Sequence, residues 1–218
     1  MVDDRPDHPR QRRLHHQVSR FGRRRLAAGL FHPARLARSM TDPRISEVIA
    51  WWRAASKDWF SKSPAFDAAF RRRFAPLHEA AMAGDLSPWE AIPEGCLALL
   101  ILLDQYPRNA FRGTREMYRA DLQALSLARH AKKQGFIDRL PQDLRLFMLL
   151  PFAHSEVLED QNLSVALHRR HLPSGLHRAR RHRDIIARFG RFPHRQPIFE
   201  RALTPEESQY LNAGGFQG

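Results

Sequence analysis

The chain has 218 residues, a formal net charge of +13 and one cysteine, and 43% of its residues are hydrophobic. That length and hydrophobic content allow a globular domain with a substantial core. A single cysteine, Cys96, excludes an intramolecular disulfide and a metal site built only from thiolates, and it fits a cytoplasmic protein. The longest apolar run is far shorter than the roughly 18 residues that span a bilayer, so no membrane partner is expected.

Much of the positive charge lies in residues 1–40. That segment holds ten arginines and three aspartates, giving it +7, which leaves +6 for residues 41–218. Its composition favours a disordered basic extension or a mis-assigned start, with the true start at Met40. A nucleic-acid-binding tail is an alternative, and the three aspartates disfavour a transit peptide. We therefore expect the folded domain to comprise residues 41–218.

Apolar residues at three- and four-residue spacing predict a series of helices along residues 41–218. A capping residue within Met40–Pro43 precedes the first helix. The second helix carries a row of phenylalanines and is expected to end at Gly84, because glycine is favoured just beyond a helix C-terminus.

The middle of the chain opens with Ser87–Glu90, which resembles a capping box with proline at the first helical position. The helix that follows Pro93 contains Leu97–Leu103, an unbroken apolar run typical of a buried segment. Pro107 disfavours helical geometry in the residue before it, so we expect this helix to stop at Tyr106.

Further helices are expected at about 114–135, from 141 to an interruption at Pro151, and at 155–170 and 175–190; a second capping box, Thr204–Glu207, opens a short last helix. No segment alternates with a period of two, so strands are not expected. Consecutive helices with short connections favour stacked antiparallel helical hairpins in a single all-α domain.

Polar residues interrupt this apolar pattern first just after Leu103. The members of this cluster are Asp104, Gln105, Arg108, Asn109 and Arg112. The helix dipole disfavours an anion in the last turn, where Asp104 lies, so we expect Asp104 to pair with Arg108 or Arg112. The cluster is therefore either a structural ion-pair network or a site that faces a ligand.

A second polar cluster holds His154, Ser155, Glu156 and Gln161. His154 and Glu156 are two residues apart and do not share a helical face, so they do not form a ready acid–base pair. Ser155 is better placed to cap a helix than to act as a nucleophile. His154 is a candidate proton-handling group, although a satisfied buried histidine is the more ordinary outcome.

A third cluster combines arginine with aromatic and histidine side chains. Its candidate ligands and proton-handling groups are His182, Arg188, Arg191, His194 and Arg195. Arginine interleaved with phenylalanine can hold phosphate, carboxylate or a nucleic-acid backbone, or can form a solvated basic face. His168 and His171 lack a carboxylate that would complete a metal motif, so no metal site and no cofactor are expected.

Taken in order, several of these pieces resemble a bacterial family known as domain of unknown function 924. The matching pieces, between about Arg44 and Gly215, include Trp59-Phe60, Asp104-Gln105-Tyr106-Pro107-Arg108-Asn109, Pro151-Phe152-Ala153-His154-Ser155-Glu156 and Arg188-Phe189-Gly190-Arg191-Phe192-Pro193-His194-Arg195. The resemblance implies a helical, tetratricopeptide-like fold, and it implies no particular chemistry. Gln196 and Phe199-Glu200-Arg201 depart from the family pattern.

The sequence thus favours a helical protein whose three polar clusters meet and bind an anionic small molecule or an acidic peptide. His154, Glu156 and His194 are the candidate catalytic groups for hydrolytic or transfer chemistry. One alternative is a peptide- or protein-binding helical scaffold. Another is RNA binding through residues 1–40 and the basic C-terminal third.

Overall fold

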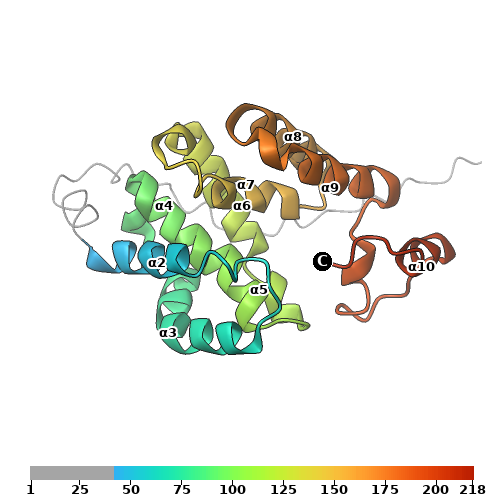
Figure 1. Cartoon of the computed structure of the whole chain (residues 1–218), viewed down its shortest axis with the longest axis horizontal. Coiled ribbons are helices and arrows are strands. Elements are labelled where there is room, and N and C mark those ends of the chain that lie inside the picture. The colour runs from blue at the N-terminus through green and yellow to red at the C-terminus, as the bar shows by residue number, and fades with distance from the viewer. Residues whose placement is uncertain (1–41) are drawn as a thin grey trace, which may run out of the picture. The chain divides into compact units, whose positions relative to one another are not determined.

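Capping residues and turns divide the chain into short helices (Figure 1). The computed structural model describes residues 42–218, so the interpretations made for residues 1–40 lie outside the described residues. The α-helices are α2 Pro43–Ala54, α3 Pro64–Ala83, α4 Pro93–Leu100, α5 Tyr106–Ala110, α6 Asp121–Lys133, α7 Leu146–His154, α8 Leu158–His171, α9 Leu176–Phe189 and α10 Pro205–Asn212.

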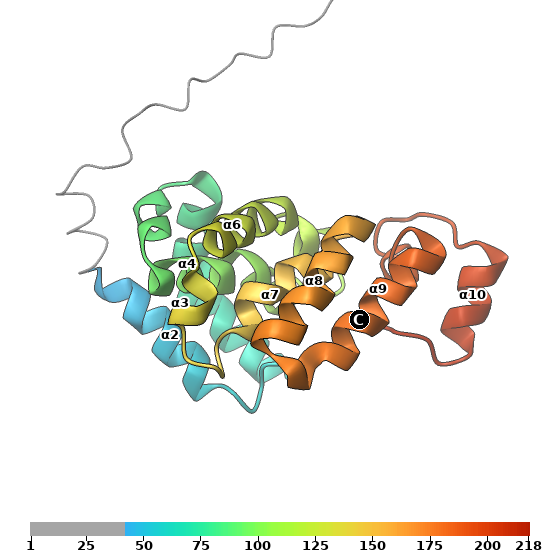
Figure 2. The same ribbon diagram turned by 90° about the horizontal axis from the view of Figure 1, so that it is seen from above.

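Residues 42–218 contain no strand, which confirms the prediction of an all-α fold. They lie within one compact unit of the chain. The helices follow one another across this unit roughly in chain order, with α8 packed beside α9 and α10 at the far end (Figure 2). Among the described helices, none combines the length and apolar character that a bilayer crossing needs. The tetratricopeptide-like stacking stays a prediction.

Aromatic side chains form the centre of the core where α2, α3 and α7 meet. Trp52 is fully buried, and its ring lies 5.4 Å from that of Phe70 and 5.2 Å from that of Phe147. Burying each such ring stabilises the fold by roughly 2–3 kcal/mol. The helix α4 lies beside these rings and is buried on almost every face. Asp104 and Gln105, which follow it in the chain, are therefore also buried.

Helix ends follow the capping predictions at several places. Asp42 caps α2, Thr204 and Glu207 form the predicted capping box of α10, and Gly84 and Gly190 end α3 and α9 in the left-handed conformation. The box expected at Ser87–Glu90 is wrong. These residues form a single 3₁₀ turn, because the chain must become extended just before Pro93 and begin a new helix there.

The helix expected to stop at Tyr106 instead continues to the end of α5 through one turn of π-helix, Ile101–Gln105. The amide of Tyr106 bonds to a carbonyl five residues back. In that register the missing N–H of Pro107 would have bonded to the carbonyl of Leu102. The Nδ1–H of His78 donates to this carbonyl instead, at 2.9 Å, so a side chain from α3 replaces the absent backbone donor.

Pro151 also lies inside a helix, whereas the sequence predicted an interruption there. The helix α7 continues because Phe147 and Phe152 on either side of the proline are both buried in the core. Ser155 does not cap α8, since the residue before that helix is Val157 and the Ser155 hydroxyl donates to Asp160 at 2.8 Å.

Candidate functional site

A buried ion-pair cluster forms where α5, α6 and the end of α7 meet the segment after α9. We call it the Asp104 group; its members are Asp104, Arg108, Asp121, His154 and Arg195. The π turn places Asp104, α7 ends at His154, and α6 begins at Asp121. The group therefore joins the first and second predicted polar clusters and one arginine of the third.

Asp104 is the anchor of the group and its side chain is only 1% exposed. His154 Nδ1 lies 2.8 Å from its Oδ1, Arg108 Nη1 lies 3.2 Å from the same oxygen, and Gln105 Nε2 donates to Oδ2 at 2.6 Å. Burial raises the pKa of Asp104, but the charges of Arg108 and His154 and the hydrogen bonds lower it to about 2. Asp104 is therefore ionised at neutral pH and paired with an arginine, as predicted.

His154 is held in one tautomer by this contact. Since the carboxylate of Asp104 accepts from Nδ1–H, the lone pair of a neutral ring lies on Nε2. Burial, and then the charge of Arg108, lowers the pKa of His154. Within the described part of the chain nothing hydrogen-bonds to Nε2, which leaves a neutral histidine with an available basic nitrogen.

Arg195 closes the group from the C-terminal side. Its guanidinium lies 4.7 Å from the ring centroid of Tyr118 and 4.6 Å from that of Phe192, and its Nη2 donates to the carbonyl of His154 at 2.9 Å. Its Nη1 is 3.7 Å from Asp121, beyond hydrogen-bond distance. Among residues 42–218, its buried Nε has no hydrogen-bond partner.

Arg108 also has unused hydrogen-bonding capacity. Its Nη2 lies 2.9 Å from Asp121 Oδ1, yet the two atoms are misaligned for a hydrogen bond, and both are buried without one. A buried donor left without a partner costs roughly 1–3 kcal/mol. Arg195 therefore presents a donor that an additional oxygen atom can satisfy, whereas the Nη2 of Arg108 already faces Asp121.

His182 and His194 lie next to the group within an aromatic cluster. The ring of His182 is 4.7 Å from that of Phe216, and the ring of His194 is 5.1 Å from it. Burial, with the charge of Arg195 next for His194, lowers the pKa of His182 to about 4 and that of His194 to about 3. Both rings are neutral at pH 7.

Comparisons with known proteins identify the family of this chain. A family model described as "Bacterial protein of unknown function (DUF924)" matches residues 48–215. The chain belongs to this family. A solved structure, that of a protein of unknown function, ATU0120, from Agrobacterium tumefaciens, shares 44% identity with a TM-score of 0.76, covering 79% of this chain and 98% of that one. The comparison with curated proteins returned no match.

Some predicted site residues of this DUF924 protein support the group from behind. Gln161 is fully buried and its amide donates to the carbonyls of Ala153 and Ser155 at 2.8 and 2.6 Å, which fixes the end of α7 beside His154. Asn109 donates to the carbonyl of Gln105 at 2.8 Å. These amides position the backbone that carries the charged groups.

Other predicted residues are engaged elsewhere. The guanidinium of Arg112 binds both oxygens of Asp67 on α3 at 2.9 and 3.0 Å. Arg188 pairs with Glu206, and Arg191 binds both oxygens of the buried Glu207, so these two attach α9 and its C-terminal turn to α10. Glu156 accepts from the backbone amide of Phe192 at 2.9 Å. None of the four contacts the Asp104–His154 pair.

Two members of the site carried no sequence signal that we recognised. Asp121 opens α6 in the DUF924 chain, where an acidic residue is explained by the helix dipole alone. Tyr118 lies in a short 3₁₀ turn. Among residues 42–218, no three His, Cys, Asp or Glu side chains are arranged to hold a metal ion.

Replacing Asp104 by asparagine tests whether the group stabilises the fold. The variant leaves Arg108 buried with Asp121 as its only remaining acid, and we expect the free energy of unfolding at pH 7 to fall by about 2–3 kcal/mol. Because a lowered carboxylate pKa contributes stability that is lost as pH falls from about 4 towards 2, the variant and the parent should converge there. Urea unfolding of the variant and the parent at pH 7, and at pH values between about 4 and 2, measures the difference in stability. Equal stability of the two proteins at pH 7 would contradict the prediction.

Proposed function

We propose that the Asp104 group binds a small molecule bearing an oxyanion and that His154 acts on it as a general base. The observation that carries this proposal is the pairing of a neutral histidine, oriented by a buried carboxylate, with the buried Nε of Arg195, which has no hydrogen-bond partner among residues 42–218. Nε2 of His154 is available to accept a proton, while Arg195 can donate to a phosphate or carboxylate oxygen.

The charge of the group supports a small, singly or doubly charged ligand. Two arginines face two aspartates, so the group is close to neutral when His154 is uncharged. An oxyanion that takes the weakly held guanidinium of Arg195 from Asp121 replaces a 3.7 Å ion pair by a direct hydrogen bond. The family assignment is compatible with this proposal and supplies no activity of its own.

The proposed chemistry is hydrolytic or group transfer. His154 would take a proton from water or from a hydroxyl as that oxygen attacks an electrophilic carbon or phosphorus atom of the ligand. The bond from that atom to its oxygen leaving group would break, and the imidazolium would return the proton to the leaving oxygen. Asp104 would hold the ring in the required tautomer and stabilise the imidazolium that forms. A positioned general base of this kind accelerates reactions by roughly 10²–10⁴-fold.

The test separates binding from proton transfer by using His154→Asn and Arg195→Lys. The asparagine amide can still donate to Asp104 in place of Nδ1 but provides no basic nitrogen. With inorganic phosphate as the probe, the Arg195 Nε–H signal in NMR spectra of the wild-type chain should shift, and Arg195→Lys should weaken binding. With p-nitrophenyl phosphate and p-nitrophenyl acetate as substrates, His154→Asn should lower turnover of at least one about 10²-fold or more.

Arg191→Lys is the matched control, since this arginine also holds a carboxylate but lies outside the group. It should leave both readouts unchanged. If phosphate causes no shift of the Arg195 signal and neither ester is turned over above the rate of His154→Asn, the group is a structural ion-pair network and the proposal is wrong.

A further inference from the structure

An open cavity lies between α9 and α10, away from the Asp104 group. Its volume is about 640 Å³, within the range of roughly 300–1,000 Å³ typical of small-molecule sites. One wall is a single face of α9, on which residues recur at three- and four-residue spacing, and the other is Tyr210 with the turn that follows α10. In that turn, an added Cβ at Gly214 would meet no atom within 4 Å, whereas Gly215 packs directly against Tyr210.

The α9 wall is positively charged. Arg180, Arg181 and Arg188 line the cavity, against one aspartate, Asp184. Asp184 is already bound by the Nε of Arg183 at 2.6 Å. Among residues 42–218, no carboxylate pairs with Arg180 or Arg181, and both side chains are exposed. Arg180 is thus free to bind an anion, while the guanidinium of Arg181 lies 5.3 Å from the ring centroid of Phe216 and keeps its N–H donors available.

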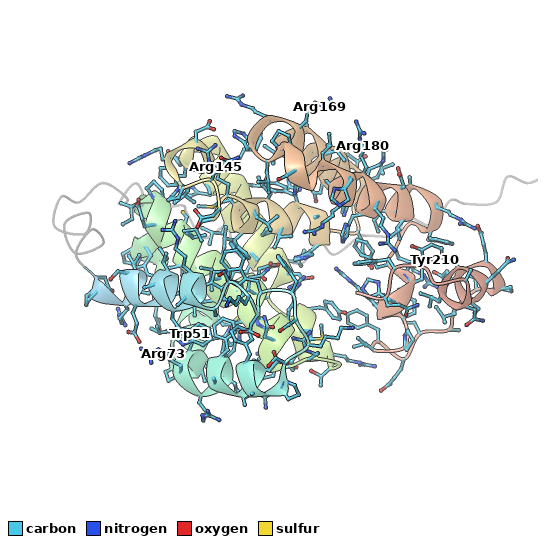
Figure 3. The ribbon with its side chains drawn as sticks, in the orientation of Figure 1. Trp51, Arg73, Arg145, Arg169, Arg180 and Tyr210 are labelled. Carbon is cyan, nitrogen blue, oxygen red and sulfur yellow. The ribbon has the colours of Figure 1, made fainter. Side chains whose placement is uncertain are left out.

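The opposite end of the cavity is aromatic. The rings of Phe189 and Tyr210 lie 5.1 Å apart, and the guanidinium of Arg188 lies 4.7 Å from the first centroid and 5.8 Å from the second. The Tyr210 hydroxyl accepts from the backbone amide of Phe216 at 3.0 Å, which fixes the ring on the side of α10 that faces α9 (Figure 3). The cavity therefore combines a fixed aromatic surface with Arg180, an exposed arginine that pairs with no carboxylate of residues 42–218.

We propose that this cavity binds a nucleotide, that is, an aromatic base carrying a phosphate. The forked donors of Arg180 and Arg181 match phosphate oxygens, and a planar base can pack against the rings at the other end. Base stacking on aromatic side chains is tolerant of base identity, so the site recognises the class and not one base. This inference does not depend on the function proposed for the Asp104 group.

The test compares AMP with its two parts, adenosine and inorganic phosphate, by titration calorimetry on the full chain. AMP should bind at least tenfold more tightly than either part. Arg180→Gln should weaken AMP binding about tenfold, the loss of one charge-assisted contact of roughly 1.4 kcal/mol. Tyr210→Leu should weaken binding of AMP but leave that of phosphate unchanged.

Arg178→Gln is the matched control, because Arg178 is an exposed arginine of the same helix that does not line the cavity. It should leave AMP binding unchanged. Because the Asp104 group is itself proposed to bind phosphate, the comparison of AMP with phosphate is repeated in Arg195→Lys, in which the preference for AMP should persist. Arg180 has no side-chain partner within the described part of the chain, so its variant should melt like the parent. The proposal is overturned if AMP binds no better than phosphate, or if Arg178→Gln and Arg180→Gln weaken AMP binding equally.

A single-stranded RNA hexamer tests the alternative of an extended basic surface. The proposal is also overturned if this RNA binds more tightly than AMP and loses affinity equally in Arg178→Gln and Arg180→Gln.

Discussion

Lowering the pH from 7 to 5 is expected to reduce the free energy of unfolding by at least about 4 kcal/mol, of which two histidines that are held neutral in the fold contribute about 4 kcal/mol. The pKa of His182 is lowered from 6.5 to about 4 and that of His194 from 6.5 to about 3. In the unfolded chain both rings take up a proton as the pH falls below about 6.5, whereas the folded protein resists this until pH 4 to 3. Each histidine therefore favours the unfolded state by about 2 kcal/mol at pH 5.

Urea unfolding at pH 7, 6 and 5 measures this dependence. His194→Phe should remove about half of the loss, because phenylalanine fits between Phe192 and Phe216 and cannot be protonated. His177→Gln, which changes an exposed histidine of α9, is the control and should behave like the parent. Stability that is flat between pH 7 and 5 would show that the two rings are not protected from protons.

Replacing Gly95 by alanine is expected to destabilise the protein by at least about 4 kcal/mol. A Cβ atom at this position in the first turn of α4 would lie 2.0 Å from the backbone carbonyl oxygen of Trp89. Trp89 cannot easily move, since its ring is buried and its Nε1 donates to Asp42 at 2.9 Å. On the other side, α4 is packed within the core.

Gly84→Ala is the matched control for this prediction. Gly84 has a φ of +83° and no atom within 4 Å of an added Cβ, so its replacement costs only the left-handed backbone energy of roughly 1–2 kcal/mol. Urea unfolding compares the two variants, and the yield of folded protein serves if Gly95→Ala does not fold. Equal destabilisation by the two substitutions would mean that α4 can shift away from Trp89.

The helical fold was predictable because its signals are local. The phenylalanine row on α3, the glycines that end α3 and α9, and the capping box of α10 each depend on residues within one or two turns. The predicted end of a helix at Tyr106 and interruption at Pro151 were wrong for a non-local reason. At Pro107, His78 on α3 replaces the missing proline N–H, and at Pro151 the burial of Phe147 and Phe152 in the core holds the helix together.

The candidate site was only partly predictable, because charge identifies a residue that needs a partner but not which partner it finds. Asp104 was expected to pair with a nearby arginine and does so with Arg108, but its contact with His154 spans 50 positions in the chain. Arg191 found Glu207, which lies outside the three predicted clusters. Helix spacing carries no information about such pairings between separate elements.

The π turn at Ile101–Gln105 sets the direction in which Arg108 leaves the helix. Successive residues of an α-helix are about 100° apart around its axis, so one extra residue in a turn rotates everything that follows by about that angle. Asp104 therefore lies within the turn, while Arg108 belongs to a register displaced from that of α4. Deleting a single residue between positions 101 and 105 would change the register and turn Arg108 away from its present partners. A substitution at one of these positions leaves the register unchanged. Relatives that lack one residue in this segment are expected to lack the contact between Arg108 and Asp121 as well.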